Sequence, residues 1–381
     1  MKLFRKTLFW LHLIAGVVAG LFILLMSLTG VLLTYERQML EQATTPAVAP
    51  LEGSRLALDQ LVDKAQSADP AGPPLTALTL HRDAAMPVQA SFGREATLWL
   101  HPQSGGKLDA GSPWLRSFFR TVTDLHRWLA LTGDWRSLGK SLTGASNLVF
   151  LFLVVSGLYL WFPRQWRWPA FRPVLWFRRG LKGKARDWNW HNVLGFWACI
   201  PLFFIVATGA LISYPWATAL LYRALGEPPP AAAGPRAGGS RTTERPASAA
   251  PASAPAALAP LQAAAEAAFP QWQTITLTLP VTKTAAVTVT EGHRGRPDLR
   301  SSLTLDPATG SVLTTERFSD FSTARQARTW GRWIHTGEAG GFCGQTLAGL
   351  ASLAAVFLVW TGFALSWRRL RRGTSTTPAQ N

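Results

Sequence analysis

The chain has 381 residues, 48% of them hydrophobic, and carries 38 Lys and Arg against 21 Asp and Glu, for a formal net charge of +17. Several apolar runs reach the roughly 20 residues that a membrane-spanning helix needs, so the composition excludes a soluble protein and indicates an integral membrane protein. A strong positive charge often accompanies nucleic-acid binding, but here the basic residues flank the apolar runs, where they orient a membrane protein. We therefore expect no nucleic-acid partner.

Four apolar runs predict membrane spans, at Leu8–Thr34, Leu142–Phe162, Val193–Pro215 and Leu347–Trp367. The first is about twice as long as the apolar core of a signal peptide and is followed by YERQMLEQ rather than a cleavage site, so we expect it to remain uncleaved. Lys and Arg concentrate in the N-terminal MKLFRK, in the connection between the second and third spans, and in RRLRR after the fourth. Because cytoplasmic flanks carry the excess of basic residues, we place both termini in the cytoplasm and the two long connections outside.

Each long connection predicts a small α+β domain. Each contains a helix-like segment (LALDQLVDKAQSA; LAPLQAAAEAAF), an alternating strand (LTALTL; QTITLTL) and a turn within LHPQSGGKL or LDPATGSVL. Alternation of apolar and polar residues between Pro and Gly turns is typical of strands. The tract GEPPPAAAGPRAGGSRTTERPASAAPASAPA before the second set cannot bury a core and predicts a flexible tether.

The chain thus divides into membrane segments and outer segments in alternation. The predicted order is transmembrane helix 1 (1–34), outer domain 1 (35–125), a histidine-bearing segment with transmembrane helix 2 (126–163), a cytoplasmic basic loop (164–190), transmembrane helix 3 (191–216), the linker with outer domain 2 (217–334), a second histidine-bearing segment with transmembrane helix 4 (335–368) and a cytoplasmic tail (369–381).

The chain also contains an internal duplication. One offset, without gaps, places LHLIAGVVAGLFILLMSLTGVLLTY on WHNVLGFWACIPLFFIVATGALISY, so that His12 meets His191 and Thr29-Gly30 meets Thr208-Gly209. A second offset places Ser156-Gly157 on Thr361-Gly362 in the even-numbered spans. Each copy contributes an even number of spans, so both insert in the same sense. This predicts a mainly α-helical membrane protein, a four-helix bundle with a pseudo-twofold axis along the membrane normal and two periplasmic α+β domains.

Four of the seven histidines lie in or beside the spans. His12 and His191 are each about one turn inside the cytoplasmic end of a helix, whereas His126 in DLHRWL and His335 in RWIHTGE lie on the outer side, before the second and fourth spans. Ionisable groups at membrane depth are costly and indicate a site. Two imidazoles that approach a symmetry axis from opposite sides are a common way to hold a haem iron. We therefore expect a cytoplasmic-side haem and a periplasmic-side haem, each with two histidines as axial iron ligands.

Other observations refine this expectation. Gly16 and Gly20 lie at i+4 and i+8 from His12 and predict room for a flat macrocycle, although they also suit close helix packing. The chain contains no CxxCH motif, so we expect non-covalent haem b, two per chain. The remaining histidines, His81, His101 and His293, have no matching partners and are interpreted as surface residues.

Interpretations of the histidines other than haem ligation stay open. An intramembrane histidine often serves as an interhelical hydrogen-bond partner, and an interfacial histidine beside Trp and Arg often anchors a helix. Zinc usually takes three or four ligands at one depth, but each depth here offers only two histidines, so zinc ranks far below haem. A transporter would need polar residues or broken helices at the midplane, where the spans show no charged residue.

Five stretches of the sequence resemble the PepSY-associated transmembrane proteins: RKTLFWLHLIAGVVAGLFILLMSLTGVLL, DLHRWL, SGLYLWFPR, WNWHNVLGFW and WIHTGEAGGFCGQ. The segments LHPQSGGKL and LDPATGSVL resemble the PepSY module. Members of this size resemble ferric-siderophore reductases of the bacterial inner membrane. The resemblance implies that His12, His126, His191 and His335 are haem ligands in a reductase that passes electrons to a periplasmic ferric siderophore and releases Fe(II) for iron uptake.

The resemblance leaves the electron donor and the substrate contacts open. No dinucleotide fingerprint occurs, so we expect the electrons to come from a quinol or a cytoplasmic flavoprotein. Candidate substrate contacts near the outer histidines are Arg127, Arg328, Arg332, Trp330 and Trp333, although membrane lipid headgroups suit the arginines equally. PepSY modules are also associated with peptidase inhibition, so the alternative is a membrane-anchored binding module that regulates a periplasmic peptidase.

Overall fold

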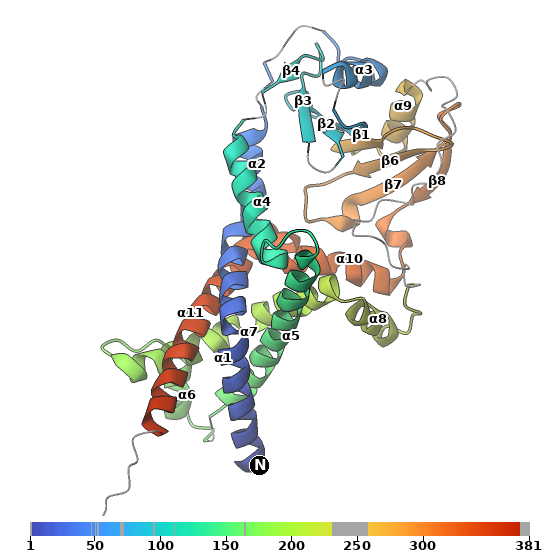
Figure 1. The fold of residues 1–381 in the computed structure, drawn as a ribbon. Coiled ribbons are helices and arrows are strands. Elements are labelled where there is room, and N and C mark those ends of the chain that lie inside the picture. Colours follow the sequence, from blue (N-terminus) through green and yellow to red (C-terminus); the bar gives the residue numbers. More distant parts are fainter. Residues whose placement is uncertain are drawn as a thin grey trace, which may run out of the picture. The chain divides into compact units, whose positions relative to one another are not determined.

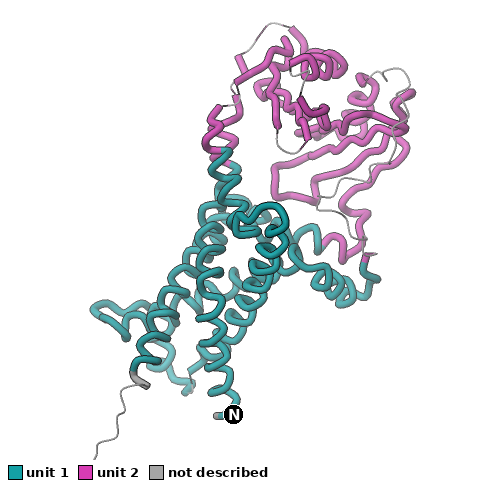
Figure 2. The backbone as a smooth tube through the Cα atoms, in the orientation of Figure 1, with its two compact units in different colours: residues 1–37, 116–229, 327–381 teal, residues 38–115, 230–326 magenta. Residues whose placement is uncertain are grey.

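The computed structural model (Figure 1) describes all of the chain except residues 1, 47, 50, 52, 69–71, 94–95, 110, 164, 231–257 and 374–381. The chain forms two compact units (Figure 2): a membrane unit of residues 1–37, 116–229 and 327–381, and a sheet unit of residues 38–115 and 230–326. Each unit is therefore built from stretches that are far apart in the sequence. Most of the predicted tether and of the predicted tail lies outside the described residues.

Four long helices form the core of the membrane unit: α1 (Lys2–Leu33), α5 (Trp135–Trp161), α7 (Gly183–Ser213) and α11 (Gly341–Gly373). Each contains a stretch that is long and apolar enough to cross a membrane, so the four predicted spans are confirmed. The helix α7 begins well before the predicted start of its span, because the polar residues in its first turns find partners inside the protein.

The four long helices pack in a closed ring (Figure 1). Helix α1 contacts α5 and α11, and α7 contacts the same two helices. The first copy of the repeat contributes α1 and α5 and the second contributes α7 and α11, so exchange of the copies maps the ring onto itself. Small residues let α7 and α11 approach closely, as in the buried cluster of Ala198 with Ala351, Ala354 and Ala355.

Shorter helices connect the long ones. They are α2 (Glu36–Thr44), α4 (Pro113–Trp128), α6 (Trp168–Leu175), α8 (Pro215–Ala224) and α10 (Thr323–His335), with single 3-10 turns at Pro297–Leu299, Phe318–Asp320 and Glu338–Gly340. A Cβ atom at Gly139 of α5 or at Gly344 of α11 would overlap the backbone carbonyl of Trp128 or of Gly337. Glycine at both positions therefore lets the segment that follows α4 or α10 lie directly against the next long helix.

The sheet unit contains one antiparallel sheet of 8 strands in the order β4-β3-β2-β1-β5-β6-β7-β8. The strands are β1 (Leu75–His81), β2 (Val88–Phe92), β3 (Ala96–Leu100), β4 (Lys107–Leu108), β5 (Thr274–Thr278), β6 (Ala285–Thr290), β7 (Arg300–Leu305) and β8 (Val312–Glu316). Strands β1 and β5 pair with Leu78 opposite Leu277. The two predicted outer domains thus share one continuous sheet, and this pairing covers two strand edges that would otherwise be open to other chains.

One helix from each copy packs on this sheet. Helices α3 (Leu58–Ala68) and α9 (Ala259–Ala268) contribute Leu61, Ala65, Leu261 and Ala265 to the buried core. Burial alternates along β6, as the alternating sequence pattern predicts. Burial of these apolar side chains on one face stabilises the sheet unit.

The expectation that His101 is a surface residue is wrong. His101 is only 6% exposed, its Nε2 contacts Ala49 O at 2.8 Å, and its Nδ1 accepts from the backbone N–H of Gln103 at 3.3 Å. In the second copy Asp306 plays the same part, because its Oδ1 accepts from Ala308 N at 2.7 Å. Both side chains organise the equivalent Pro-x-x-Gly turn, so His101 has a local structural role.

Candidate functional site

The four predicted haem-ligand histidines all belong to the membrane unit. We call the end where α1 and α7 begin the inner end, and the opposite end the outer end. His12 on α1 and His191 on α7 lie near the inner end, whereas His126 in the last turn of α4 and His335 at the end of α10 lie at the outer end. The structure therefore places the histidines at two levels, one from each copy of the repeat at each level.

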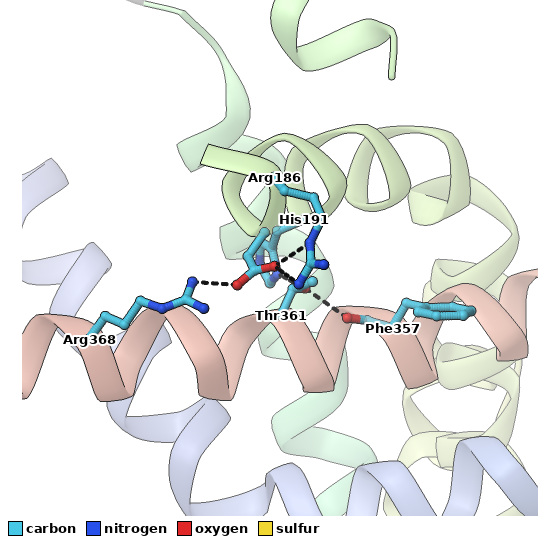
Figure 3. A network of polar contacts seen from close by, with 6 residues as sticks. Arg186, His191, Phe357, Thr361 and Arg368 are labelled. Atoms are coloured by element: carbon cyan, nitrogen blue, oxygen red, sulfur yellow. Dashed lines mark hydrogen bonds and ion pairs between the residues drawn. The ribbon is translucent and has the colours of Figure 1, made fainter. Parts of the chain in front are cut away.

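The two inner histidines have equivalent partners. His12 Nδ1 lies 2.8 Å from Ser156 Oγ on α5, and His191 Nδ1 lies 2.9 Å from Thr361 Oγ1 on α11 (Figure 3). Both hydroxyl groups are buried, with exposed fractions of 3% and 1%. The repeat that matches these residues in sequence therefore matches their contacts in space.

The two outer histidines lie against the far ends of α1 and α7. His126 Nδ1 lies 2.9 Å from Thr29 Oγ1, and His335 Nδ1 lies 2.8 Å from the backbone oxygen of Ile205. The centroids of the two imidazole rings are 6.4 Å apart, with the ring planes inclined at 60°. Two imidazoles on opposite sides of one metal, with metal–nitrogen bonds of about 2 Å, would have centroids about 6 Å apart.

The hydrogen bonds assign the same tautomer to all four imidazoles. Ser156, Thr361 and Thr29 each donate their hydroxyl proton to the carbonyl four residues earlier in the helix, at 2.6, 2.7 and 2.7 Å. A hydroxyl group has a single proton to donate, so each of these oxygens accepts from histidine Nδ1–H. The carbonyl of Ile205 accepts from His335 in the same way. Each ring therefore keeps the Nε2 lone pair for another partner, as histidines that bind a metal do.

Four glycines of the long helices, each preceded by Ser or Thr, lie against one histidine ring each. A Cβ atom at Gly157 would lie 3.2 Å from His12 Cε1, and one at Gly362 would lie 3.6 Å from His191 Cε1. At the outer end the corresponding distances are 3.7 Å from Gly30 to His126 and 3.2 Å from Gly209 to His335. Thus each of four Ser/Thr-Gly dipeptides, at residues 29–30, 156–157, 208–209 and 361–362, provides room for one imidazole.

The outer imidazoles are electrically neutral at ordinary pH. Burial, together with the nearby His335 and Arg127, lowers the pKa of His126 to about 4. Burial likewise lowers the pKa of His335. Neutral imidazole is the form that binds a metal ion.

This donor set suits haem better than a mononuclear metal site. Within the described part of the chain, no group of three or more His, Cys, Asp or Glu side chains is arranged to hold a metal ion. Haem brings four nitrogen ligands of its own and needs only axial protein ligands, which histidine commonly supplies. At each end, two imidazoles whose Nδ1 atoms have partners within the protein therefore fit as the two histidine ligands of one haem.

The prediction that Gly16 and Gly20 leave room for a macrocycle beside His12 is wrong for Gly20. A Cβ atom at Gly20 would lie 2.5 Å from Phe363 Cζ, so a phenyl ring already fills that position. At Gly16 the nearest side-chain atom, on Leu153, would be 3.9 Å away. The glycines that contact the histidines come instead from neighbouring helices. The sequence contained this signal, because the Ser/Thr-Gly pairs recur in both copies, but sequence alone did not connect them to particular histidines.

The candidate substrate contacts differ in accessibility. Arg127 and Arg332 are exposed at the outer end, whereas Arg328, Trp330 and Trp333 are half-buried. The guanidinium of Arg127 lies 4.8 Å from the ring of Trp128, and that of Arg332 lies 5.5 Å from the ring of Trp333. Such cation–π contacts hold the two guanidinium groups at the surface.

A buried ion pair fixes α7 next to His191. Asp187, one turn before His191, is 1% exposed and accepts from Arg186 at 2.9 Å and from Arg368 of α11 (Figure 3). Nearby, Asn189 Nδ2 donates to the carbonyl of Pro173 at 2.6 Å, which ties α6 to α7, and to the carbonyl of Trp176 at 3.1 Å in the connection after α6. In the sequence Asp187 is the acidic residue in an otherwise basic loop, but this pattern alone does not predict its buried ion pairs.

Residues 9–369 match the protein family described as PepSY-associated TM region. This stretch includes the four long apolar segments and all four histidines of the bundle. None of the curated proteins matches the chain in sequence.

Proposed function

The chain belongs to the PepSY-associated transmembrane family, and we propose that it is a haem b oxidoreductase of the bacterial inner membrane that reduces ferric siderophores in the periplasm. The released Fe(II) would serve iron uptake. A quinol or a cytoplasmic flavoprotein would supply the electrons. The basic flanks support an orientation with both termini in the cytoplasm, which makes the inner end cytoplasmic and the outer end periplasmic.

The observation that carries the proposal is the repetition of one histidine environment. Each end of the bundle has two imidazoles in the Nδ1–H form, each with a glycine against its ring. His12 and His191 would hold one haem, and His126 and His335 the other. On α1, His12 and Thr29 are separated by about 25 Å at the rise of an α-helix, so the two pairs lie near opposite faces of the membrane.

The residues of the chain then have defined tasks. When bound, haem supplies the reversible Fe(III)/Fe(II) couple that carries electrons. The hydroxyl and carbonyl partners orient each imidazole and raise its basicity, as second partners of ligating histidines do. Two histidines would hold each haem, so we expect the substrate to bind to the protein surface at the outer end.

The exposed arginines at the outer end favour an anionic substrate. Arg127 and Arg332 present guanidinium groups, which suit carboxylates and other oxyanions. A ferric siderophore holds Fe(III) with hard oxygen donors. Fe(II) is a softer and weaker partner for those oxygens, so reduction would release the metal.

Purified full-length protein in detergent tests the proposal. We expect a red preparation with a b-type reduced-minus-oxidised spectrum and about two haems per chain. After reduction with dithionite and removal of the excess, it should reduce a ferric siderophore, with the Fe(II) measured by a chromogenic chelator. A folded, colourless protein would overturn the proposal and favour the alternative, a PepSY module that regulates a periplasmic peptidase.

A pair of histidine variants tests the ligand assignment. His335→Ala should lose the outer haem and keep the inner one, which halves the haem content. His293→Ala removes an exposed histidine of the sheet unit and should keep both haems. Retention of two haems by His335→Ala would exclude His335 as a ligand.

A further inference from the structure

A pocket of about 490 Å³ opens at the inner end of the bundle. It lies among the connection after α6, the first turns of α7 and the middle of α11. The lining residues that matter here are Arg178, Arg179, Arg186, Trp190, Leu194 and Phe357. The pocket is separate from the histidine contacts described above, because none of the four histidines lines it.

One side of the pocket is strongly positive. The carboxylate of Asp187 is buried and already shared between Arg186 and Arg368. Within the described residues, the guanidinium groups of Arg178 and Arg179 have no carboxylate partner, and both side chains are exposed. Three arginines that line one pocket, with a single carboxylate shared by one of them, favour an anionic ligand, and guanidinium groups bind phosphate well.

The other side of the pocket is apolar and belongs to the membrane-spanning helices. The ring of Trp190 packs edge-on against Phe357, with centroids 6.2 Å apart. Phe357 of α11 is 40% exposed and Leu194 of α7 is half-buried, and both lie within stretches long and apolar enough to cross a membrane. This side therefore borders the acyl region of the bilayer rather than water.

We propose that this pocket binds an anionic phospholipid, with its phosphate against the three arginines and an acyl chain along Leu194 and Phe357. Basic pockets beside transmembrane helices on the cytoplasmic side recognise anionic headgroups in this way. A quinol is neutral and would leave the arginines without a partner. A soluble flavin nucleotide has a phosphate but no tail for the apolar side. The proposal does not depend on haem.

Native mass spectrometry of the full-length protein tests this site, with phosphatidylglycerol and phosphatidylcholine as the two probes. The wild type should retain phosphatidylglycerol in preference to phosphatidylcholine. Each basic residue near a membrane surface contributes a factor of about 5 in affinity. The double variant R178Q/R179Q should therefore bind phosphatidylglycerol about 25-fold more weakly and lose most of the preference.

The matched control is K182Q/K184Q. It removes the same charge a few residues further along the chain, at Lys182 before α7 and Lys184 in its first turn, but neither lysine lines the pocket. We expect it to bind phosphatidylglycerol as the wild type does. If R178Q/R179Q does not fold, the single variant R179Q should show a loss of about 5-fold.

Three results would overturn the proposal. The first is equal retention of phosphatidylcholine and phosphatidylglycerol by the wild type. The second is an equal loss in K182Q/K184Q, which would indicate general attraction to a basic surface. The third is displacement of bound phosphatidylglycerol by equimolar ubiquinol or flavin mononucleotide, which would assign the pocket to an electron donor instead.

Discussion

Replacement of Thr361 by Val tests whether the hydroxyl partner orients the inner histidine. Thr361→Val keeps the shape of a side chain that is 1% exposed, but it removes the acceptor 2.9 Å from His191 Nδ1. Loss of such a partner typically lowers the affinity of a ligating histidine for its metal about 10- to 100-fold. This range agrees with the cost of about 1–3 kcal/mol for a buried donor left without an acceptor.

Haem retention is the assay. Haem content is measured from the b-type spectrum after dilution into buffer that contains apomyoglobin as a haem acceptor. We expect the inner haem of Thr361→Val to dissociate about 10- to 100-fold more readily, while the outer haem is retained. Thr361→Ser keeps the hydroxyl and should restore retention. Thr218→Val removes another buried threonine hydroxyl, which donates to Leu211 O at 3.2 Å, and should keep both haems.

Two results would refute this reasoning. Haem retention by Thr361→Val equal to that of the wild type would show that the hydroxyl group does not support the histidine. Equal loss in Thr218→Val would show that any buried hydroxyl in the bundle matters to the same extent. In either case the Ser/Thr-Gly pattern would reflect helix packing alone.

Two further predictions use matched variants. Gly157→Ala places a Cβ atom 3.2 Å from His12 Cε1 and should weaken inner haem retention by about 1–3 kcal/mol. The control is Gly16→Ala, whose Cβ atom would have its nearest neighbour at 3.9 Å and should have no such effect. Similar losses from both variants would contradict the contact between Gly157 and His12. Asp187→Asn removes the negative charge and one of the two buried acceptor oxygens that bind Arg186 and Arg368, and should lower the free energy of unfolding in mixed SDS micelles by about 1–3 kcal/mol. Asp298→Asn, in a more exposed ion pair, should change it by less than about 1 kcal/mol, and equal losses would exclude a special role for Asp187.

The membrane fold was largely predictable because its signals are local. Span length follows from bilayer thickness and from the length of each apolar run. The internal repeat was visible in the sequence. It identified His12 and His191 as equivalent residues, and the even number of spans in each copy implied that both copies insert in the same sense. These inferences need no knowledge of which side chain touches which.

The contacts of the site were not predictable, because they join residues that are far apart in the sequence. His191 and Thr361 are separated by 170 residues, and His126 and Thr29 by 97. Which helix faces meet depends on packing of the whole bundle, and no periodicity in one helix specifies its neighbour's rotation. The matched Ser/Thr-Gly pairs were therefore visible in the sequence as a pattern without a partner.

In the outer segments, single strands were predictable but their pairing was not. Alternation predicted individual strands, but it does not specify which strand lies at an edge or what it pairs with. The pairing of Leu78 with Leu277 joins two segments that the sequence presented as separate domains. The burial of His101 was not predicted either. The equivalent residue in the second copy is an aspartate, Asp306, and only the turn geometry shows that both side chains accept from the backbone N–H two residues later.

The junction between β1 and β5 also has a consequence for biosynthesis. Strands β1–β4 are complete once Leu108 has been made, but β1 has no partner for its second edge until Thr274–Thr278 emerge. At about 5–20 residues per second, translation of the intervening stretch takes about 10–30 s. Throughout that interval the open edge can pair with another nascent copy. The second half-sheet belongs to the same chain and is therefore present at high effective concentration, which favours pairing of β1 with β5 within one chain over pairing between two copies.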